Sequence, residues 1–311
     1  MDHPAEIQFT LIRRPVEWSV QRFPDIRHVV VTPMKNEEDY FPMLIESMLS
    51  QTFKPVKWII VDDKSQDKSS NIALELASSH EWIEYYFASE DEKRRRGKKV
   101  ARLFNLGLEK CGIGWDYCSK IDADMILPQD YFERVMEKFG SDAILGIASG
   151  NCVVNSWFRE RKEISTKDHT RGGLKTYRRS CFEDIGGIRE VDGWDGIDNA
   201  MAQMKGWKTK NFPDIIVEHL RVTGGHNGQI RSQFEAGGFA HFMGYYWPYI
   251  FARSIFQMVK WPFFIGGISL LFGYVYSAIR MKTKFDETEV VDFIRKEQRI
   301  SLKIFKFIGI K

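Results

Sequence analysis

Apolar and polar positions along the first two thirds of the chain follow two alternating periods. Compact apolar runs occupy residues 28–32 and 57–61, and their β-branched side chains are typical of strands buried on both faces. Residues 38–51 and 65–79 instead carry apolar side chains at helical spacing, and residues 85–88 have the pattern of a third, short strand. This succession of strand, helix, strand, helix and strand predicts an α/β fold with a mostly parallel sheet and right-handed crossovers.

The same alternation continues to residue 217, and then the composition changes. Further helices are expected at residues 100–108, 131–139 and 199–205, and further strands at residues 116–121, 144–155, 172–177 and 215–217. Beyond Gly224, glycine and aromatic residues become dense and strand signals stop. We therefore expect an α/β domain over residues 1–223 and a helical, apolar C-terminal region over residues 224–311.

Residues 261–279 of this C-terminal region contain no charged side chain, and basic residues flank them on both sides. At about 1.5 Å per residue the stretch approaches the length that crosses a bilayer. Residues 290–308 then mix apolar with basic side chains, as amphipathic surface helices do. A crossing would put the basic tail on the far side, against the positive-inside tendency, whereas an in-plane segment or a soluble helical subdomain would not. We favour peripheral membrane contact through residues 261–308, at the inner face of the membrane.

The charge balance and the cysteines restrict the class of protein. Lys and Arg total 45 and Asp and Glu total 42, so the formal charge of +3 gives no field that would attract nucleic acid. The four cysteines have neither CxxC pairing nor the spacing of metal ligands, which favours reduced thiols. Acidic residues interrupt the first six positions and no apolar leader follows, so we expect a cytoplasmic protein.

Acidic residues follow three of the predicted strands. Ligands of parallel sheets bind beyond the carboxyl ends of the strands, and there the chain has Glu37, Asp63 and the pair Asp122 and Asp124. Two carboxylates one residue apart at a strand end can both reach Mn²⁺ or Mg²⁺, whose coordination diphosphate oxygens and water complete. An exposed acidic turn is the commoner explanation of an isolated DxD pair. Its position beside the other strand-end acids favours a metal site here.

Five segments in this order resemble the inverting family-two glycosyltransferases of the GT-A fold. They are VVVTPMKNEE at 29–38, WIIVDDKSQDKS at 58–69, RGKKVARLFNLGL at 96–108, KIDADMIL at 120–127 and IGGIRE at 185–190. The third segment departs from the family pattern by two residues inserted between its Ala and its Asn. The resemblance covers residues 28–219. It implies a GT-A nucleotide-diphospho-sugar transferase fold and transfer of a sugar from a nucleotide donor, with UDP favoured, to a hydroxyl with inversion.

The resemblance also implies partners and roles. The acceptor would be a glycan or a lipid-linked sugar in the synthesis of cell-surface polysaccharide or glycolipid, and the cofactor would be Mn²⁺ or Mg²⁺. Pocket roles for the nucleotide fall on Pro33, Glu37, Asp63, Lys98, Lys99 and Asp122. Asp63 would accept a hydrogen bond from a base N–H, and the alternative for this acid is helix capping. The two lysines, which belong to the basic run 93–99, would contact the base or the diphosphate, and a solvated loop face is the alternative. Asp124 would bind the metal directly, with Asp122 near the ribose and the metal.

The catalytic base is the least well defined part of the resemblance. The family places an acid shortly before a helix, and here that position falls on Gly196. Asp195 is the favoured base, because a shift of one residue in a glycine-flanked loop still presents its carboxylate. Asp198 is the reserve, although an acid at a helix start is more often a cap. Trp194 has two interpretations, stacking on a sugar or, more commonly, packing in the core.

His219 ends the last predicted strand and is a candidate third metal ligand, since neutral imidazole suits Mn²⁺. A lone histidine is as often a satisfied polar group. Two other functions compete with sugar transfer. One is a nucleotide-sugar-binding protein on the same fold that has lost catalysis, which the glycine at 196 would explain. The other is a nucleotidyltransferase, against which the segment PMKNEE argues because such enzymes carry a glycine-rich basic loop there.

Overall fold

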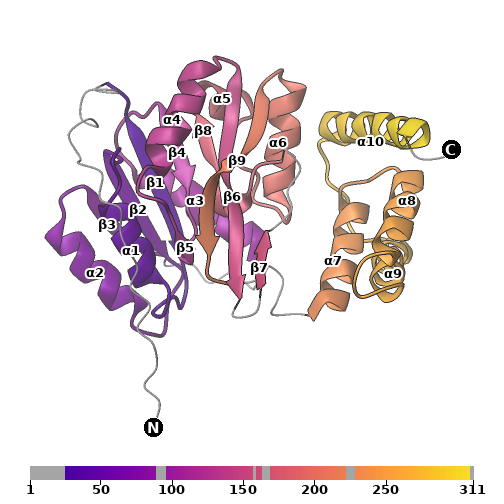
Figure 1. Ribbon diagram of the computed structural model, residues 1–311, viewed down its shortest axis with the longest axis horizontal. Coiled ribbons are helices and arrows are strands. Elements are labelled where there is room, and N and C mark those ends of the chain that lie inside the picture. Colours follow the sequence, from indigo (N-terminus) through magenta and orange to yellow (C-terminus); the bar gives the residue numbers. More distant parts are fainter. Residues whose placement is uncertain (1–24, 89–95, 157–158, 163–168, 222–227, 309–311) are drawn as a thin grey trace, which may run out of the picture.

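The computed structural model describes residues 25–88, 96–156, 159–162, 169–221 and 228–308 (Figure 1). The first half contains β1 (His28–Met34), α1 (Phe41–Leu49), β2 (Lys57–Asp62), α2 (Ser69–Ser79), β3 (Ile83–Phe87), α3 (Arg96–Lys110), β4 (Tyr117–Lys120), β5 (Met125–Ile126) and α4 (Tyr131–Ser141). The second half contains β6 (Leu145–Ser156), β7 (Arg159–Lys162), the 3₁₀ turn η1 (Gly172–Leu174), β8 (Thr176–Arg178), α5 (Arg179–Asp184), α6 (Trp194–Met204) and β9 (Lys208–His219). Four helices follow: α7 (Gly228–Phe242), α8 (Trp247–Met258), α9 (Ile265–Ile279) and α10 (Thr288–Ile308).

All strands of the described residues join one sheet in the order β3-β2-β1-β4-β8-β6-β9-β5, with β7 paired to β6. The strands β3, β2, β1 and β4 are parallel, as the alternation of strands and helices predicts. The short strand β8 runs antiparallel between β4 and β6, and β5 runs antiparallel to β9. The carboxyl ends of β1, β2 and β4 therefore lie at one edge.

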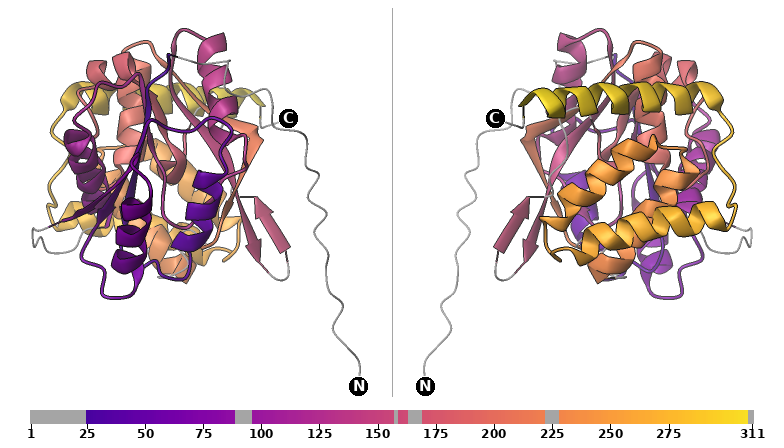
Figure 2. Two further views of the ribbon diagram at one scale, coloured as in Figure 1. Left: turned by 90° about the vertical axis from the view of Figure 1, so that its left-hand side faces the viewer. Right: turned by 90° about the vertical axis from the view of Figure 1, so that its right-hand side faces the viewer.

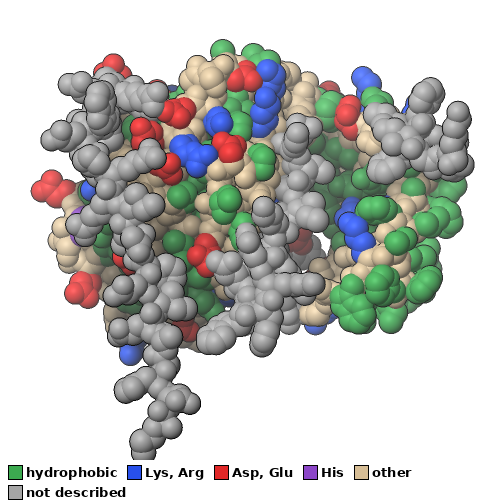
Figure 3. Space-filling view, viewed as in Figure 1, with side chains coloured by type: hydrophobic (Ala, Val, Ile, Leu, Met, Phe, Trp, Pro, Cys, Tyr) green, Lys and Arg blue, Asp and Glu red, His purple; other side chains and the backbone are tan. Residues whose placement is uncertain are grey.

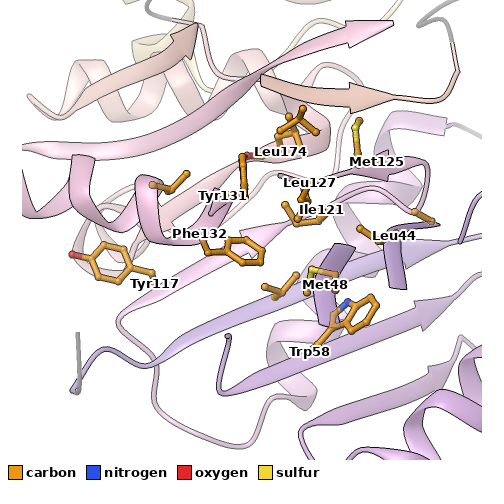
Figure 4. Packing of buried hydrophobic residues seen from close by; sticks show 14 of the residues in the cluster. Leu44, Met48, Trp58, Tyr117, Ile121, Met125, Leu127, Tyr131, Phe132 and Leu174 are labelled. Carbon is orange, nitrogen blue, oxygen red and sulfur yellow. The ribbon is translucent and has the colours of Figure 1, made fainter. Parts of the chain in front are cut away.

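Helices cover both faces of the sheet, and two hydrophobic clusters fill the space beneath them. Successive residues of β1 show the division, because Val30 packs with α1 and α4 while Val29 and Val31 pack with α3 and α6. Figure 4 shows part of the first cluster, in which Trp58 and Met48 lie near each other and Tyr117 lies at the opposite side. Burial on both faces explains why β1 and β2 are apolar almost throughout.

Several element boundaries differ from those predicted, and three of the differences have a clear local cause. β1 continues through Pro33, because its pairing with β4 stops at Val31 and the missing N–H of Pro33 costs no ladder bond. Residues 172–177 form a 3₁₀ turn before the strand rather than one strand. α6 begins at Trp194, five residues before the predicted start. Gly193 precedes it at φ 74°, and a Cβ there would lie 2.0 Å from the Phe239 ring of α7.

The four C-terminal helices pack together beyond α6, at the right of Figure 1, and Figure 2 shows α10 running across α7, α8 and α9. α9 packs between α7 and α8, and α10 contacts α6 through a core that includes Val290, Val291 and Phe285. Among the described residues, none of the helices combines the length and the apolar character that a membrane span requires.

Candidate active site

The sheet register brings the acid-bearing segments together. Met34 pairs with Asp62 across β1 and β2, and Val31 pairs with Lys120 across β1 and β4. The segments that follow the three strands therefore start side by side. Two backbone bonds continue the ladder beyond the strands, from the Asp63 N–H to the Met34 carbonyl at 2.8 Å and from the Ile121 N–H to the Val31 carbonyl at 3.1 Å.

Asp63 lies in this edge with two lysines around its carboxylate. Its side chain is 6% exposed, and Lys35 Nζ and Lys99 Nζ lie 3.1 Å and 2.5 Å from its two oxygens. The side chain thus faces the site rather than capping α2. Asp62 takes the structural role, because its carboxylate accepts hydrogen bonds from the backbone and hydroxyl of Ser65 and from Ser70 and Tyr85.

Lys98 and Pro33 are placed less centrally. Lys98 is exposed at the start of α3, and its backbone N–H donates to Asp192 at 3.4 Å. Pro33 is buried within β1 opposite Val61. Of the basic run that the sequence suggests, residues 93–95 lie outside the described residues, and Lys99 supplies the ion pair to Asp63. His226 and its glycine-rich segment also lie outside them.

A second cluster joins Glu37, Asp124, His219 and Arg221. Asp124 follows β4, and pairing of Met125 with His219 brings β9 beside it. His219 Nε2 lies 3.3 Å and Arg221 Nε 2.9 Å from the same oxygen of Asp124. The guanidinium of Arg221 also pairs with Glu37. Two carboxylates from different strand ends thus share one arginine.

Burial and the neighbouring charges give the two acids opposite pKa shifts. Burial raises the pKa of Glu37 to about 7, against the hydrogen bond and charge of Arg221. Burial also opposes ionisation of Asp124, but the hydrogen bond from His219 and the charges of His219 and Arg221 outweigh it and lower the pKa of Asp124 to about 2. One oxygen of Glu37 is buried and accepts no hydrogen bond. An unmet carboxylate oxygen beside an ionised aspartate favours an incoming cation.

The donor set fits a divalent cation of the kind that phosphate substrates complete. Asp124 and His219 share a contact, and their carboxylate and imidazole suit Mn²⁺. Among the described residues, no group of three or more His, Cys, Asp or Glu side chains is arranged as a ready metal site. Asp122 stands apart from the other two, since its carboxylate pairs with Lys120. In sites that bind phosphoryl groups, Mg²⁺ is commonly coordinated by two protein ligands together with phosphate oxygens.

Asp122 and Asp195 meet at the pair Gly172 and Gly173. A Cβ on Gly173 would lie 2.8 Å from Asp122 Oδ2, and a Cβ on Gly172 would lie 3.2 Å from Asp195 Oδ2. The backbone N–H of Asp122 donates to the Gly173 carbonyl at 3.0 Å, and Lys120 Nζ donates to the Gly172 carbonyl at 3.0 Å. Two glycines therefore bring a strand-end acid and a helix-start acid close together. Asp195 is half-buried in the first turn of α6, in a helix rather than in the loop predicted for it.

Asp198 has a different environment. It is 1% exposed, and its carboxylate accepts hydrogen bonds from Lys175 and from the Tyr177 hydroxyl. Burial raises its pKa to about 6, and burial lowers the pKa of Lys175. Lys175 Nζ also donates to the Asp195 carbonyl at 2.5 Å. Asp198 thus holds the start of α6 in place and does not face the site.

Apart from Lys99, sequence reasoning missed the cations of this site. Trp194 is 5% exposed and lies between two buried ammonium groups, with Lys120 Nζ 5.4 Å and Lys175 Nζ 5.5 Å from its ring centroid. The core-packing interpretation of Trp194 is the one that fits. Both lysines stand in apolar or glycine-rich strand contexts, where a charged residue is a signal of a buried partner. Arg221 stands two residues after a strand-end histidine, and no spacing rule singles it out.

The fold has known counterparts among solved structures. It resembles Staphylococcus aureus TarS residues 1–349 in complex with UDP-GlcNAc, with a TM-score of 0.52 and 12% identity over 87% of this chain and 81% of that one. It also resembles the mannosyltransferase PcManGT of Pyrobaculum calidifontis in complex with GDP-Man and Mn²⁺, with a TM-score of 0.51 and 16% identity over 96% and 81%. These similarities identify the fold, which is the GT-A fold with a C-terminal helical extension.

The sequence comparisons identify the family. The sequence profile of glycosyl transferase family 2 matches residues 29–189, which is more than half of the chain, and the chain belongs to this family. Glycosyltransferase GlyA of Streptococcus pneumoniae is 30% identical over 114 residues, which is 37% of this chain and 15% of that protein. Poly-beta-1,6-N-acetyl-D-glucosamine synthase of Staphylococcus aureus is 26% identical over 144 residues, which is 44% and 33%. The match thus spans a third or less of the length of these relatives.

Proposed function

We propose that this protein transfers a sugar from a nucleoside diphosphate donor, with UDP favoured, to a hydroxyl of a glycan or lipid-linked acceptor, with inversion and with Mn²⁺ or Mg²⁺. Residues 1–223 would be the catalytic unit. The observation that carries the proposal is the convergence of Asp63, Asp122, Asp124 and Asp195 around the carboxyl ends of β2 and β4. Family membership and the poly-beta-1,6-N-acetyl-D-glucosamine synthase among the relatives support the reaction class.

The donor would bind along the strand ends from Asp63 to Asp124. Asp63 offers a nearly buried carboxylate to a base N–H, and a base without that donor leaves the acceptor unmet at a cost of about 1–3 kcal/mol. Lys35 and Lys99 form ion pairs with that carboxylate. Asp122, which follows β4 two residues before Asp124, would contact a ribose hydroxyl. Asp124 and His219 would hold the cation, and the bound cation would neutralise the diphosphate as it leaves.

Asp195 is our candidate for the base. Its carboxylate would remove the proton of the acceptor hydroxyl, whose oxygen then forms the bond to the anomeric carbon as the bond to the diphosphate oxygen breaks. Attack from the face opposite the diphosphate inverts the configuration. The proximity of Asp195 to Asp122 across Gly172 and Gly173 supports this role, and Lys175 fixes the backbone that carries it.

A donor panel tests the proposal. The purified chain is incubated with UDP- and GDP-sugars and Mn²⁺, and released nucleoside diphosphate is measured. We expect Asp195→Asn to lower kcat by about 10²- to 10⁴-fold with UDP affinity unchanged, because a base acts on the acceptor and not on the donor. Asp124→Asn should weaken Mn²⁺-dependent UDP binding. Asp130→Asn, an exposed acid at the start of α4, is the matched control.

The outcomes separate the candidate functions. UDP binding with no turnover for any donor would support a binding protein that has lost catalysis. Full activity of Asp195→Asn would remove Asp195 from the mechanism. Release of pyrophosphate from a nucleoside triphosphate would support a nucleotidyltransferase instead.

A further inference from the structure

The C-terminal helices expose an apolar surface that the active site does not use. Of the twenty-one large hydrophobic side chains that are exposed among the described residues, fourteen lie between Trp247 and Met281. They come from α8, the segment 259–264, α9 and Met281 just after it, and we call them the apolar face. Figure 3 shows these side chains gathered at the lower right, over α8 and α9. A soluble protein rarely exposes so large a contiguous patch without a binding role.

In α9 the small residues point inward and most of the large apolar residues point outward, which is the reverse of a helix that faces water. Its glycines point inward, and a Cβ on Gly273 would lie 2.0 Å from the Phe234 carbonyl of α7. A Cβ on Gly267 would lie 2.2 Å from the Ser254 carbonyl of α8. The large residues of α9 follow one stripe at spacings of three and four residues and point outward. Small residues at helix contacts and large apolar residues outside are typical of helices that face an apolar medium.

The charges around the apolar face have one sign. Residues 236–285 contain no Asp or Glu and five basic residues, Arg253, Lys260, Arg280, Lys282 and Lys284, all of them exposed. The formal charge of the whole chain is +3, so the remainder of the chain carries −2. A positive rim around exposed tryptophans and phenylalanines complements an anionic lipid headgroup layer.

We propose that the apolar face is a docking surface for an anionic lipid bilayer, on which α8 and α9 lie in the plane of the interface. Trp261, Phe264 and Phe272 would enter the boundary between headgroups and acyl chains, and the basic rim would contact the phosphates. A second copy of the chain is the less favourable occupant. Two such faces would bring five basic residues each together, and the face contains no acid to pair with them.

The apolar face differs from the membrane-contacting segment, residues 261–308, that the composition of the sequence predicts. The first half of α10 turns apolar residues inward, where Val290 and Val291 pack with Met243 and Phe285. The docking surface therefore takes in α8, which precedes that range, and leaves out this part of α10. Membrane docking also goes beyond sugar transfer, and neither depends on the other in the test that follows.

Vesicle flotation tests the proposal. The full chain is mixed with vesicles of phosphatidylcholine alone or of equal parts phosphatidylcholine and phosphatidylglycerol. We expect the wild type to float with the anionic vesicles and less with the neutral ones. Trp261→Gln/Ile268→Gln/Phe272→Gln should reduce the bound fraction by about tenfold or more, since three large apolar side chains lose their burial in lipid.

Two matched variants serve as controls. Val56→Gln/Leu74→Gln/Phe87→Gln removes three similarly exposed apolar side chains at the β3 end of the molecule, and its flotation should equal the wild type. Lys260→Gln/Lys282→Gln/Lys284→Gln should remove the preference for anionic vesicles. All variants should keep the UDP binding of the wild type, which separates loss of docking from loss of the active site.

Several results would overturn the proposal. They are a wild type that floats with neither vesicle, an apolar-face variant that floats as well as the wild type, and a dimer without vesicles that this variant dissociates. If the triple variant does not fold, brominated lipids give a second measurement on the wild type. Bromine should quench tryptophan emission, and Trp247→Phe/Trp261→Phe should remove most of that quenching. Emission that brominated vesicles leave unchanged would equally rule out insertion.

Discussion

Replacement of Asp198 by Asn tests the division between structural and catalytic acids. In the wild type the carboxylate accepts hydrogen bonds from Lys175 and Tyr177, and the Lys175 side chain is 0% exposed. The neutral amide of Asp198→Asn would leave a buried ammonium without its counter-charge. Breaking a buried pair in this way costs about 3–5 kcal/mol of the free energy of unfolding. Lys175→Met should cost a similar amount, because it leaves the carboxylate alone.

The double variant gives the sharper measurement. Asp198→Asn/Lys175→Met removes both charges, so we expect it to lose about 2–4 kcal/mol less than the two single losses added together. Urea unfolding at neutral pH, followed by circular dichroism, measures all four proteins. Asp195→Asn is the matched control one helical turn away, and it should unfold within about 0.5 kcal/mol of the wild type because its half-buried side chain bonds no buried cation.

Either of two results would refute this reasoning. If Asp198→Asn unfolds at the urea concentration of the wild type and loses transfer, Asp198 is a reacting group and its burial is not a structural feature. If the losses of the single variants simply add, the ion pair does not couple α6 to β8. In either case the positioning role of Lys175 beneath Asp195 would fail with it.

Two further predictions concern the cluster at Asp124. Arg221→Gln should tighten Mn²⁺ binding in the absence of donor by about two- to fivefold. The reason is that the partly exposed ion pair between Arg221 and Asp124, worth about 0.5–1 kcal/mol, no longer competes with the cation. Electron paramagnetic resonance of free Mn²⁺ measures the affinity, and weaker binding would contradict the prediction. Because the folded pKa of Glu37 is about 7 and its ordinary value 4.5, the free energy of unfolding should fall as pH rises through that window, by about 1–2 kcal/mol after allowance for screening by solvent. Glu37→Gln should remove this contribution in urea titrations of the metal-free protein, most clearly between pH 6 and 7, above the folded pKa of Asp198, which is about 6.

The parallel strands of the first half follow from the sequence because burial on both faces leaves a readable pattern. β1 and β2 are apolar almost throughout, acids come after β1, β2 and β4, and the parallel register then places those acids at one edge. The antiparallel insertion of β8 between β4 and β6 could not be predicted in the same way. Its three residues are too few to show a period, and the turn at Gly172 precedes it.

The acids of the site were predictable and their partners were not. Asp63 and Asp124 follow strands directly, so their positions are set by local chain order. Arg221 reaches Glu37 across 184 positions of the chain, and Lys175, the residue before β8, reaches Asp198 of α6. Such contacts depend on tertiary packing, which no local period encodes. The start of α6 was also missed, because Gly193 reads as a loop residue while its positive φ serves the helix start.

The exposure of each cation separates the acids that can exchange partners from those that cannot. Each of four acids in the site has a cation of the chain's own: Asp63 has Lys35, Asp122 has Lys120, Asp124 has Arg221 and Asp198 has Lys175. The side chains of Lys120 and Lys175 are at most 1% exposed, so moving either would strand a charge in the core. Those of Lys35 and Arg221 are 46% and 35% exposed and can turn toward solvent or toward a diphosphate at small cost. In the proposed site, the acids that can accept a base or a metal are therefore Asp63, which follows β2, and Asp124, which lies between β4 and β5. Asp122 and Asp198 would keep their buried lysines and stay fixed while a nucleotide binds.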